Sequence, residues 1–385
     1  MSTAPEQRVG PSEAAVEAPA PGPSPGPSRT WLRLPIVRHL AIVIVAGVAF
    51  WIASELFSPF NQLRLSYGAY YFCALAGLTL LVGLNGQISL GHGGLFAAGA
   101  YAAALINYTL HWPLLPAMVG AVVAATVIGG ILGVAAARLR GPYLAGATLA
   151  FALALPGVTD RFSGLFGGEN GITGNPPIVP GFLGGSNLSI TLYEAWITGV
   201  CAAIVLFVLL NLTRSGVGRS WRAVRDDEIA AALCGIHVGR TQVRAFVVSA
   251  ACAGLGGAAY LAVYNAVTPD AFEITLSFAL LAGVVIGGLG SFAGAAYGAV
   301  ILVMVPSWSQ DITNALSLNL SQSATNNLPN AIYGIVLIAV MFAAPRGLQG
   351  LLLAGAHRLR ARRTPRPPAA PVAQPFTHMP TGGEE

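Results

Sequence analysis

The chain has 385 residues, of which 55% are hydrophobic and only 9% are charged, and its mean hydropathy is +0.67. Soluble domains usually carry about 25% charged residues, so this composition excludes most soluble classes and favours membrane spans of about 20 residues each. All twenty basic residues are arginines and the net charge is +5, which raises the question of which side of a membrane they occupy.

Both ends of the chain differ in composition from its apolar middle. Residues 1–35 are rich in Pro, Ala, Gly and Ser, and they lack the charged start and hydrophobic centre of a secretory signal. Residues 351–385 are rich in Arg and Pro. Segments of such composition cannot bury a core. We therefore expect two disordered cytoplasmic tails around a transmembrane domain at 36–350.

Apolar runs follow one another through this domain, and we expect an all-α, polytopic membrane protein of about ten spans. A helix of such length crosses about 30 Å of hydrocarbon and satisfies its own backbone hydrogen bonds. Two pairs of runs are separated by Gly-rich breaks, so each pair is either two crossings or a broken, re-entrant pair of helices. The runs lie at residues 38–57, 66–85, 94–110, 114–137, 142–159, 192–212, 243–264, 274–288, 292–306 and 330–344.

The arginines test this division of the chain. With the N-terminus in the cytoplasm, every arginine except Arg64 and Arg161 falls in a cytoplasmic segment. Short cytoplasmic loops of membrane proteins carry an excess of Lys and Arg, and a wrong number of spans would scatter the arginines over both sides. We therefore predict that both termini are cytoplasmic.

Two long loops are expected on opposite sides of the membrane. The external loop, 160–191, is dense in Gly, Pro and Asn, and is either a docking surface for an external partner or a passive connector. The cytoplasmic loop, 213–242, contains three arginines at spacing three, which share a face if the segment is helical. Within it we expect a short helix that starts at Asp226–Glu228 and ends at Gly235. The alternative is a solvated loop.

No catalytic constellation is present in the sequence. There is no phosphate-binding loop, nucleophile elbow or zinc motif, and the four cysteines are expected to be free, buried thiols. We therefore predict neither an enzyme nor a cofactor or metal site. Acidic and basic residues lie in loops, in tails or near span ends, with Glu55 and Glu194 closest to lipid depth. This argues against coupling to an ion gradient, which normally uses ionisable groups inside the membrane.

Six segments in order resemble the membrane subunit of high-affinity branched-chain amino acid ABC importers, the LivM-like permeases. Together they run from about residue 66 to residue 350. The segments are GQISLGH at 86–92, GPYL at 141–144 with TLAFA at 148–152, GGENGITG at 167–174, RDDEIAA at 225–231, GGLGS at 287–291 and PRGL at 345–348.

The resemblance implies an inner-membrane subunit in a heteromeric complex. Its partners would be a second related permease, two cytoplasmic ABC ATPases and an extracytoplasmic solute-binding protein, with lipid around it and no nucleic acid. The loop resembles the ATPase-coupling loop of importer permeases, although the spacing from Glu228 to Gly235 is one residue longer than usual and Ile229 interrupts the Glu-Ala pair. The coupling residues carried over are Arg222, Arg225, Asp226, Asp227, Glu228, Ala230, Ala231 and Gly235.

The two Gly-rich breaks look like weak copies of one another. Interrupted helices in corresponding halves of a transporter often flank its transport site, but glycines also allow tight helix packing, here between subunits, and both interpretations stay open. For His92 a structural hydrogen bond is preferred to solute contact. The residues predicted to line a translocation path are Asn85, Gln87, Ser89, His92, Gly287, Gly288 and Gly290.

The function expected is translocation of branched-chain, hydrophobic amino acids with ATP hydrolysed by the partners. A urea or short-chain amide permease is the nearest alternative, because substrate choice lies largely in the binding protein. A stand-alone secondary transporter and a structural scaffold are alternatives from other classes.

Overall fold

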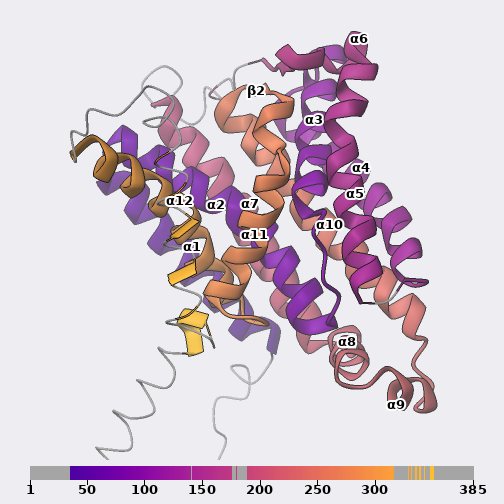
Figure 1. The fold of residues 1–385 in the computed structure, drawn as a ribbon. Helices are drawn as coiled ribbons and strands as arrows, with labels where there is room; N and C mark the ends of the chain where they lie inside the picture. The colour runs from indigo at the N-terminus through magenta and orange to yellow at the C-terminus, as the bar shows by residue number, and fades with distance from the viewer. Residues whose placement is uncertain are drawn as a thin grey trace, which may run out of the picture.

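The computed structural model describes residues 35–139, 141–175, 179 and 189–315, together with scattered positions between 328 and 350. The expected tails and most of the run 330–344 lie outside these residues. Almost every described segment is helical (Figure 1), because uninterrupted apolar sequence has no other way to satisfy its backbone groups inside a membrane.

The first half of the described chain contains five long helices and a small cap. Prolines at the first positions of two of these helices have the backbone angle that a helix start requires. The elements are α1 (Pro35–Leu56), α2 (Pro59–Leu78), the π-helical turn η2 (Thr79–Leu84), α3 (His92–Thr109), α4 (Leu114–Ala136), α5 (Pro142–Arg161), α6 (Ser163–Phe166), the 3-10 turn η3 (Gly168–Asn170) and β1 (Ile172–Thr173).

The second half adds the remaining long helices and two short ones between α7 and α10. The elements are α7 (Ile190–Arg214), α8 (Gly216–Asp226), α9 (Glu228–Leu233), α10 (Val238–Tyr264), β2 (Ala266–Val267), the 3-10 turn η6 (Pro269–Phe272), α11 (Ile274–Gly287) and α12 (Phe292–Ala315).

Among the described residues, seven helices are long and apolar enough to cross a membrane. They make the chain a polytopic helical membrane protein. Helices α3 and α12 coincide with two further expected runs, but α3 is not among the seven, and the apolar part of α12, Phe292–Trp308, is shorter. The count of ten spans and the cytoplasmic placement of the termini therefore stay predictions.

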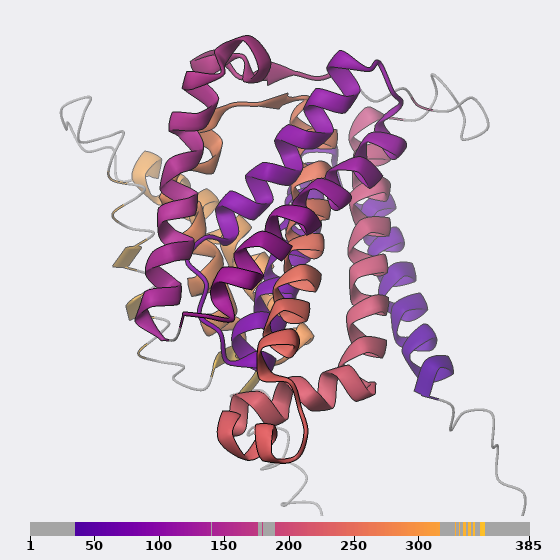
Figure 2. The same ribbon diagram turned by 90° about the vertical axis from the view of Figure 1, so that its right-hand side faces the viewer.

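The core of the bundle is built around α2 and α10. Their apolar windows are 78% and 72% buried, whereas α1 packs mainly against α7 at one edge, as Figure 2 shows. Small residues let the central helices approach closely, since a Cβ added at Gly99 in α3 would overlap the backbone of Gly254 in α10. The helices around α2 and α10 can therefore contact them through backbone atoms as well as through side chains.

Short elements occupy the two ends of the bundle. At one end, β1 and β2 form a two-residue antiparallel ribbon in which Ile172 pairs with Val267, beside α6. At the other end, α8 and α9 turn across the base of the bundle (Figure 1). These are called below the β1–β2 end and the α8–α9 end. The described part of the expected external loop therefore belongs to one end, and the expected cytoplasmic loop to the other.

The two Gly-rich breaks have different structures. Helices α11 and α12 lie antiparallel, with Gly283 against Gly298 and Gly287 against Gly294, so this pair is a hairpin of two long helices. At the other break, α2 continues through the π-helical turn to Leu84, and residues 86–91 are not helical.

The non-helical segment 86–91 ends inside the bundle. Its last residue precedes His92, the first residue of α3, which contacts Ser249 near the midpoint of α10. Asn85, which directly precedes the segment, follows η2, and η2 contacts α8. The segment therefore leads from the α8–α9 end to the middle of the bundle.

Candidate functional site: the α8–α9 surface and the segment 85–92

Helix α8 lies against the bundle by one face. Gly218, Trp221 and Val224 recur every three positions and are buried, and the Trp221 indole, 0% exposed, donates a hydrogen bond from Nε1 to the carbonyl of Thr241 at 3.1 Å. A buried tryptophan with its N–H paired is a strong anchor. It fixes α8 to the start of α10.

Helix α9 begins and ends where the sequence predicts a short helix. Asp227 caps its start, because Oδ1 accepts hydrogen bonds from the backbone N–H groups of Ile229 at 2.8 Å and Ala230 at 3.0 Å. Gly235, at φ +80°, ends it: its N–H donates to Ala232 and that of the next residue donates to Ala231, both at 3.0 Å, which is a Schellman cap.

Several charged residues of the predicted coupling set contact the chain's own helices. Arg222 donates from Nη2 to the carbonyl of Thr213 at 3.1 Å. Arg225 donates from Nη1 to the carbonyl of Gly83 at 2.7 Å. Arg222 therefore ties α8 back to α7, and Arg225 ties it to the end of α2.

Two acidic side chains of the same set complete these links. Asp226 accepts both Nε and Nη2 of Arg225, at 3.1 and 2.8 Å. Glu228 accepts a hydrogen bond from Nε2 of Gln242 in α10 at 3.0 Å. Glu228 thus attaches α9 to α10, whereas the caps fix only where α9 begins and ends.

The outward face of α9 is apolar, which the sequence reasoning missed. Ile229 and Leu233, four residues apart, are 75% and 85% exposed, whereas Ala231 between them is buried. Cys234 is also exposed, so the expectation that all four cysteines are buried is wrong for this one, because the chain leaves the bundle here. The signal was available in the helical spacing of Ile229 and Leu233, which both follow the helix cap Asp227.

The predicted path residues between α2 and α3 form a buried polar segment, 85–92. Asn85, Gln87, Ser89 and His92 are 3%, 6%, 1% and 0% exposed. Asn85 donates from Nδ2 to Oε1 of Gln87 at 2.7 Å. Their other polar atoms, Oδ1 of Asn85, Nε2 of Gln87, Oγ of Ser89 and Nδ1 of His92, have no hydrogen-bond partner among the described residues. Buried polar atoms are rarely left unpaired, so such a concentration needs an explanation.

His92 is held by one of its two ring nitrogens. The Ser249 hydroxyl donates to the carbonyl of Gly77 at 2.7 Å, and Nε2 of His92 lies 3.4 Å from the same hydroxyl oxygen. Because the single hydroxyl hydrogen is already used, this contact assigns the imidazole hydrogen to Nε2 and leaves Nδ1 as an acceptor. His92 therefore has the expected structural hydrogen bond and one open acceptor.

Hydroxyl groups from two other helices cap the start of α3. The N–H of Leu90 donates to Oγ1 of Thr148 in α5 at 3.0 Å, and the N–H of Gly93 donates to Oγ of Ser277 in α11 at 3.1 Å. These N–H groups have no partner within α3 itself. Helices α5, α10 and α11 therefore meet at the point where the segment 85–92 joins α3.

The predicted path glycines of the second break are packed by backbone. A Cβ added at Gly287 would overlap the carbonyl of Gly294, and one added at Gly83 would overlap the backbone N of Gly290. A Cβ added at Gly347 would likewise lie only 2.5 Å from Cα of Gly288. The structure thus brings the second break beside the start of the first, but as a tightly packed turn within one chain.

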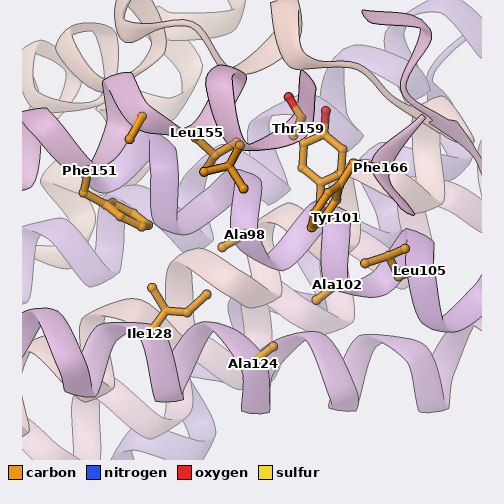
Figure 3. A pocket seen from close by; sticks show the side chains of 12 residues that line it. Ala98, Tyr101, Ala102, Leu105, Ala124, Ile128, Phe151, Leu155, Thr159 and Phe166 are labelled. Atoms are coloured by element: carbon orange, nitrogen blue, oxygen red, sulfur yellow. The ribbon is translucent and has the colours of Figure 1, made fainter. Parts of the chain in front are cut away.

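The structure also contains an apolar cavity of about 310 Å³ between α3, α4, α5 and α6 (Figure 3). Phe151, Leu155 and Ile128 line one part of it, and Tyr101 and Phe166 lie at the other. None of the predicted path residues lines it. The sequence does not predict this cavity, because the cavity forms where α4 and α5 both pack on α3 but diverge from each other.

The comparison with family models assigns the bundle to a family. Residues 59–344 match the model described as "Branched-chain amino acid transport system / permease component". The chain belongs to this permease family. The matched region includes every element from α2 to α12, and so includes both breaks and the α8–α9 surface.

Curated relatives agree with this family. The chain is 33% identical over 297 residues to the high-affinity branched-chain amino acid transport system permease protein LivM of Salmonella typhimurium, covering 71% of this chain and 66% of that protein. It is 27% identical over 305 residues to LivH of Escherichia coli, covering 76% and 94%.

The family is broader than amino acid transport. A ribose import permease, RbsC of Haemophilus influenzae, is 26% identical over 318 residues, covering 78% of this chain and 90% of that protein. No solved structure matches this chain.

Proposed function

We propose that this chain is the membrane-spanning permease subunit of a binding-protein-dependent ABC importer. It carries branched-chain amino acids across the bacterial plasma membrane with ATP that partner subunits hydrolyse. The observation that carries the proposal is the α8–α9 surface: two short helices anchored by Trp221 and Asp227 present Ile229 and Leu233 to solvent. Each such side chain gains about 1.5–3 kcal/mol when a partner covers it.

The partners follow from this surface and from the family. Two ATPase subunits dock on the α8–α9 surfaces of this chain and of a second, related permease; the similarity to both LivM and LivH supports such a pair. The loop 160–191, whose described part lies at the β1–β2 end, receives an extracytoplasmic solute-binding protein. The α8–α9 end and both termini lie in the cytoplasm in this proposal, which the arginines of 213–242 support.

The segment 85–92 is the part of the translocation path that this chain supplies. Its unpaired atoms include two donors, Nε2 of Gln87 and Oγ of Ser89, and two acceptors, Oδ1 of Asn85 and Nδ1 of His92. A zwitterionic amino acid has a carboxylate for the donors and an ammonium group for the acceptors. Few partners and no fixed charge make the contact weak, which suits passage rather than storage.

Transport by this mechanism needs no covalent chemistry in the chain. Closure of the ATPases around ATP pushes on α8 and α9, whose links to α2, α7 and α10 carry the displacement into the bundle. The bundle then exposes the segment 85–92 alternately to the two sides. The chain acts as a gate and holds no cofactor.

Reconstitution tests the proposal. Proteoliposomes that contain this chain, the second permease, the ATPases and ATP, with the binding protein outside, should accumulate leucine, isoleucine and valine. Urea, acetamide and ribose serve as competing solutes, because the family also contains a ribose permease. Selective uptake of urea or acetamide would replace the amino acid assignment.

A double substitution tests the coupling surface. Glu228→Arg breaks the hydrogen bond to Gln242, and Gly235→Pro cannot adopt φ +80°. Uptake should be abolished while the chain remains in the membrane. Normal solute-stimulated ATP hydrolysis in this double variant would show that the ATPases do not couple through α9.

A stand-alone secondary transporter is the second candidate, and one observation favours it. Glu194, in the second turn of α7, is only 5% exposed, and a buried acid is the usual relay of an ion-coupled transporter. The importer proposal expects Glu194→Gln to retain ATP-driven uptake. Accumulation by the purified chain alone, driven by a proton or sodium gradient, would favour the second candidate.

A further inference from the structure

The side chain of Arg225 connects the α8–α9 surface to the start of the first helix break. Its Nη1 donates to the carbonyl of Gly83 in η2 at 2.7 Å, while Nε and Nη2 are held by Asp226. Arg225 lies in α8 and Gly83 in η2, and 142 positions of sequence separate the two residues. The contact is therefore a property of the fold and not of the local chain.

Gly83 is a place where a helix accepts a cation well. The last carbonyl groups of a helix have no partner within it, and the C-terminal end of a helix carries a partial negative charge. The carbonyl of Gly83 lies in the last turn of η2, two residues before Asn85. A guanidinium at this point both satisfies the carbonyl and stabilises the position at which the helix ends.

The backbone around this contact leaves no free space. Gly86 has φ +76°, and a Cβ added there would lie 2.9 Å from Cγ of Arg225. A Cβ added at Gly83 would overlap the backbone N of Gly290 in the turn between α11 and α12. Arg225, Gly83 and Gly290 thus form one packed contact, called here the Arg225 junction. A displacement of α8 must move the other two members.

The turn that the junction holds is π-helical, which is an unusual state. Isolated π-helical turns are hydrogen-bonded between residues i and i+5 instead of i and i+4, and they occur frequently at functional sites. A return to α-helical hydrogen bonding shifts the following segment along and around the helix axis. Thr79 begins this turn, and the unpaired polar atoms of 85–92 follow it directly.

We propose that Arg225 is the positioning residue that transmits displacement of α8 to the π-helical turn 79–84, whose change of register re-aims the polar segment 85–92. The inference rests on the proposed function, since it assumes that ATPases move α8. Arginine is required rather than lysine because its planar fork binds Asp226 and Gly83 at once, which a single ammonium group on a flexible stem does not reproduce.

The test is the number of solute molecules transported per ATP in the reconstituted complex. Loss of a charge-assisted hydrogen bond corresponds to about tenfold or more in an equilibrium, so Arg225→Ala should lower this ratio by about tenfold with the ATPases still bound. Arg225→Lys should fall between Arg225→Ala and the unchanged chain. Arg219→Ala is the matched control, because Arg219 lies on the same exposed face of α8 as Arg225 but its side chain makes no hydrogen bond with the described residues, and it should keep the ratio. A merely structural role would lower uptake and ATP hydrolysis together and leave the ratio unchanged.

Hydrogen exchange gives a second, independent readout. On ATP addition the amides of 85–91 should change their exchange rate in the unchanged complex and in Arg219→Ala, but not in Arg225→Ala. An unaltered ATP response in Arg225→Ala, or an unaltered transport ratio, overturns the inference while the proposed function stands. Failure of the ATPases to assemble with the unchanged chain overturns the proposed function, and the transmission role with it.

Discussion

The two Gly-rich breaks are similar in sequence and differ in structure. The first, after α2, leaves four polar side chains buried with unpaired atoms. The second, between α11 and α12, is filled by backbone from Gly294, Gly347 and the end of η2. Glycine thus serves two purposes in one chain. At the first break it frees the chain from helical geometry, and at the second it removes side chains so that backbones touch.

This difference predicts that substitutions at the two breaks fail in different assays. At the second break the cost should appear as lost stability. At the first, removal of an unpaired atom should appear as lost transport with stability kept, because these atoms contribute no hydrogen bond to the folded state.

The largest effect is expected at the packed break. Gly287→Ala places a Cβ on the carbonyl of Gly294, and such overpacking costs about 1–3 kcal/mol of unfolding free energy. Gly146→Ala in α5 is the matched control, since a Cβ there meets nothing within 4 Å, and removing a glycine from a helix interior adds about 0.5–1 kcal/mol. The melting temperatures of the two variants, measured by thermal unfolding in detergent, test both expectations. Equal melting temperatures for the two variants would contradict the packed turn.

Ser89→Ala should separate transport from stability. The Ser89 hydroxyl is buried without a partner, and removing an unsatisfied buried group recovers about 1–3 kcal/mol. The melting temperature should therefore stay or rise, while the KM for uptake increases several-fold. A fall in melting temperature with transport unchanged would assign Ser89 to the packing of the bundle and not to the path.

The smallest effect is expected at His92, where two substitutions divide the roles of the ring nitrogens. Glutamine can donate as Nε2 does to Ser249, and asparagine places a polar atom near Nδ1. His92→Gln should keep the melting temperature and lower uptake a few-fold. His92→Asn should lower the melting temperature, but each folded molecule should keep more uptake activity than in the His92→Gln variant. The opposite pattern would remove Nδ1 from the path.

Local sequence predicts the α8–α9 region well at the level of elements. Asp227 and Gly235 have the chemistry of a helix start and a helix end, and both act as such. The arginine spacing gives a shared face of α8. The spacing does not show that Arg225 bonds to η2, nor that Ile229 and Leu233 are exposed. Helical periodicity shows which residues share a face, but not which other element packs against that face.

The sequence by itself determined the class of the molecule, its helices, the short helix α9 and the membership of a permease family, because these follow from composition, periodicity and motifs along the chain. Only the tertiary structure decided which break is packed and which keeps unpaired polar groups, where the cavity between α3, α4 and α5 lies, and that α8 contacts η2. Those properties depend on which backbones lie against one another, and residues more than a hundred positions apart are brought together only when the helices have packed.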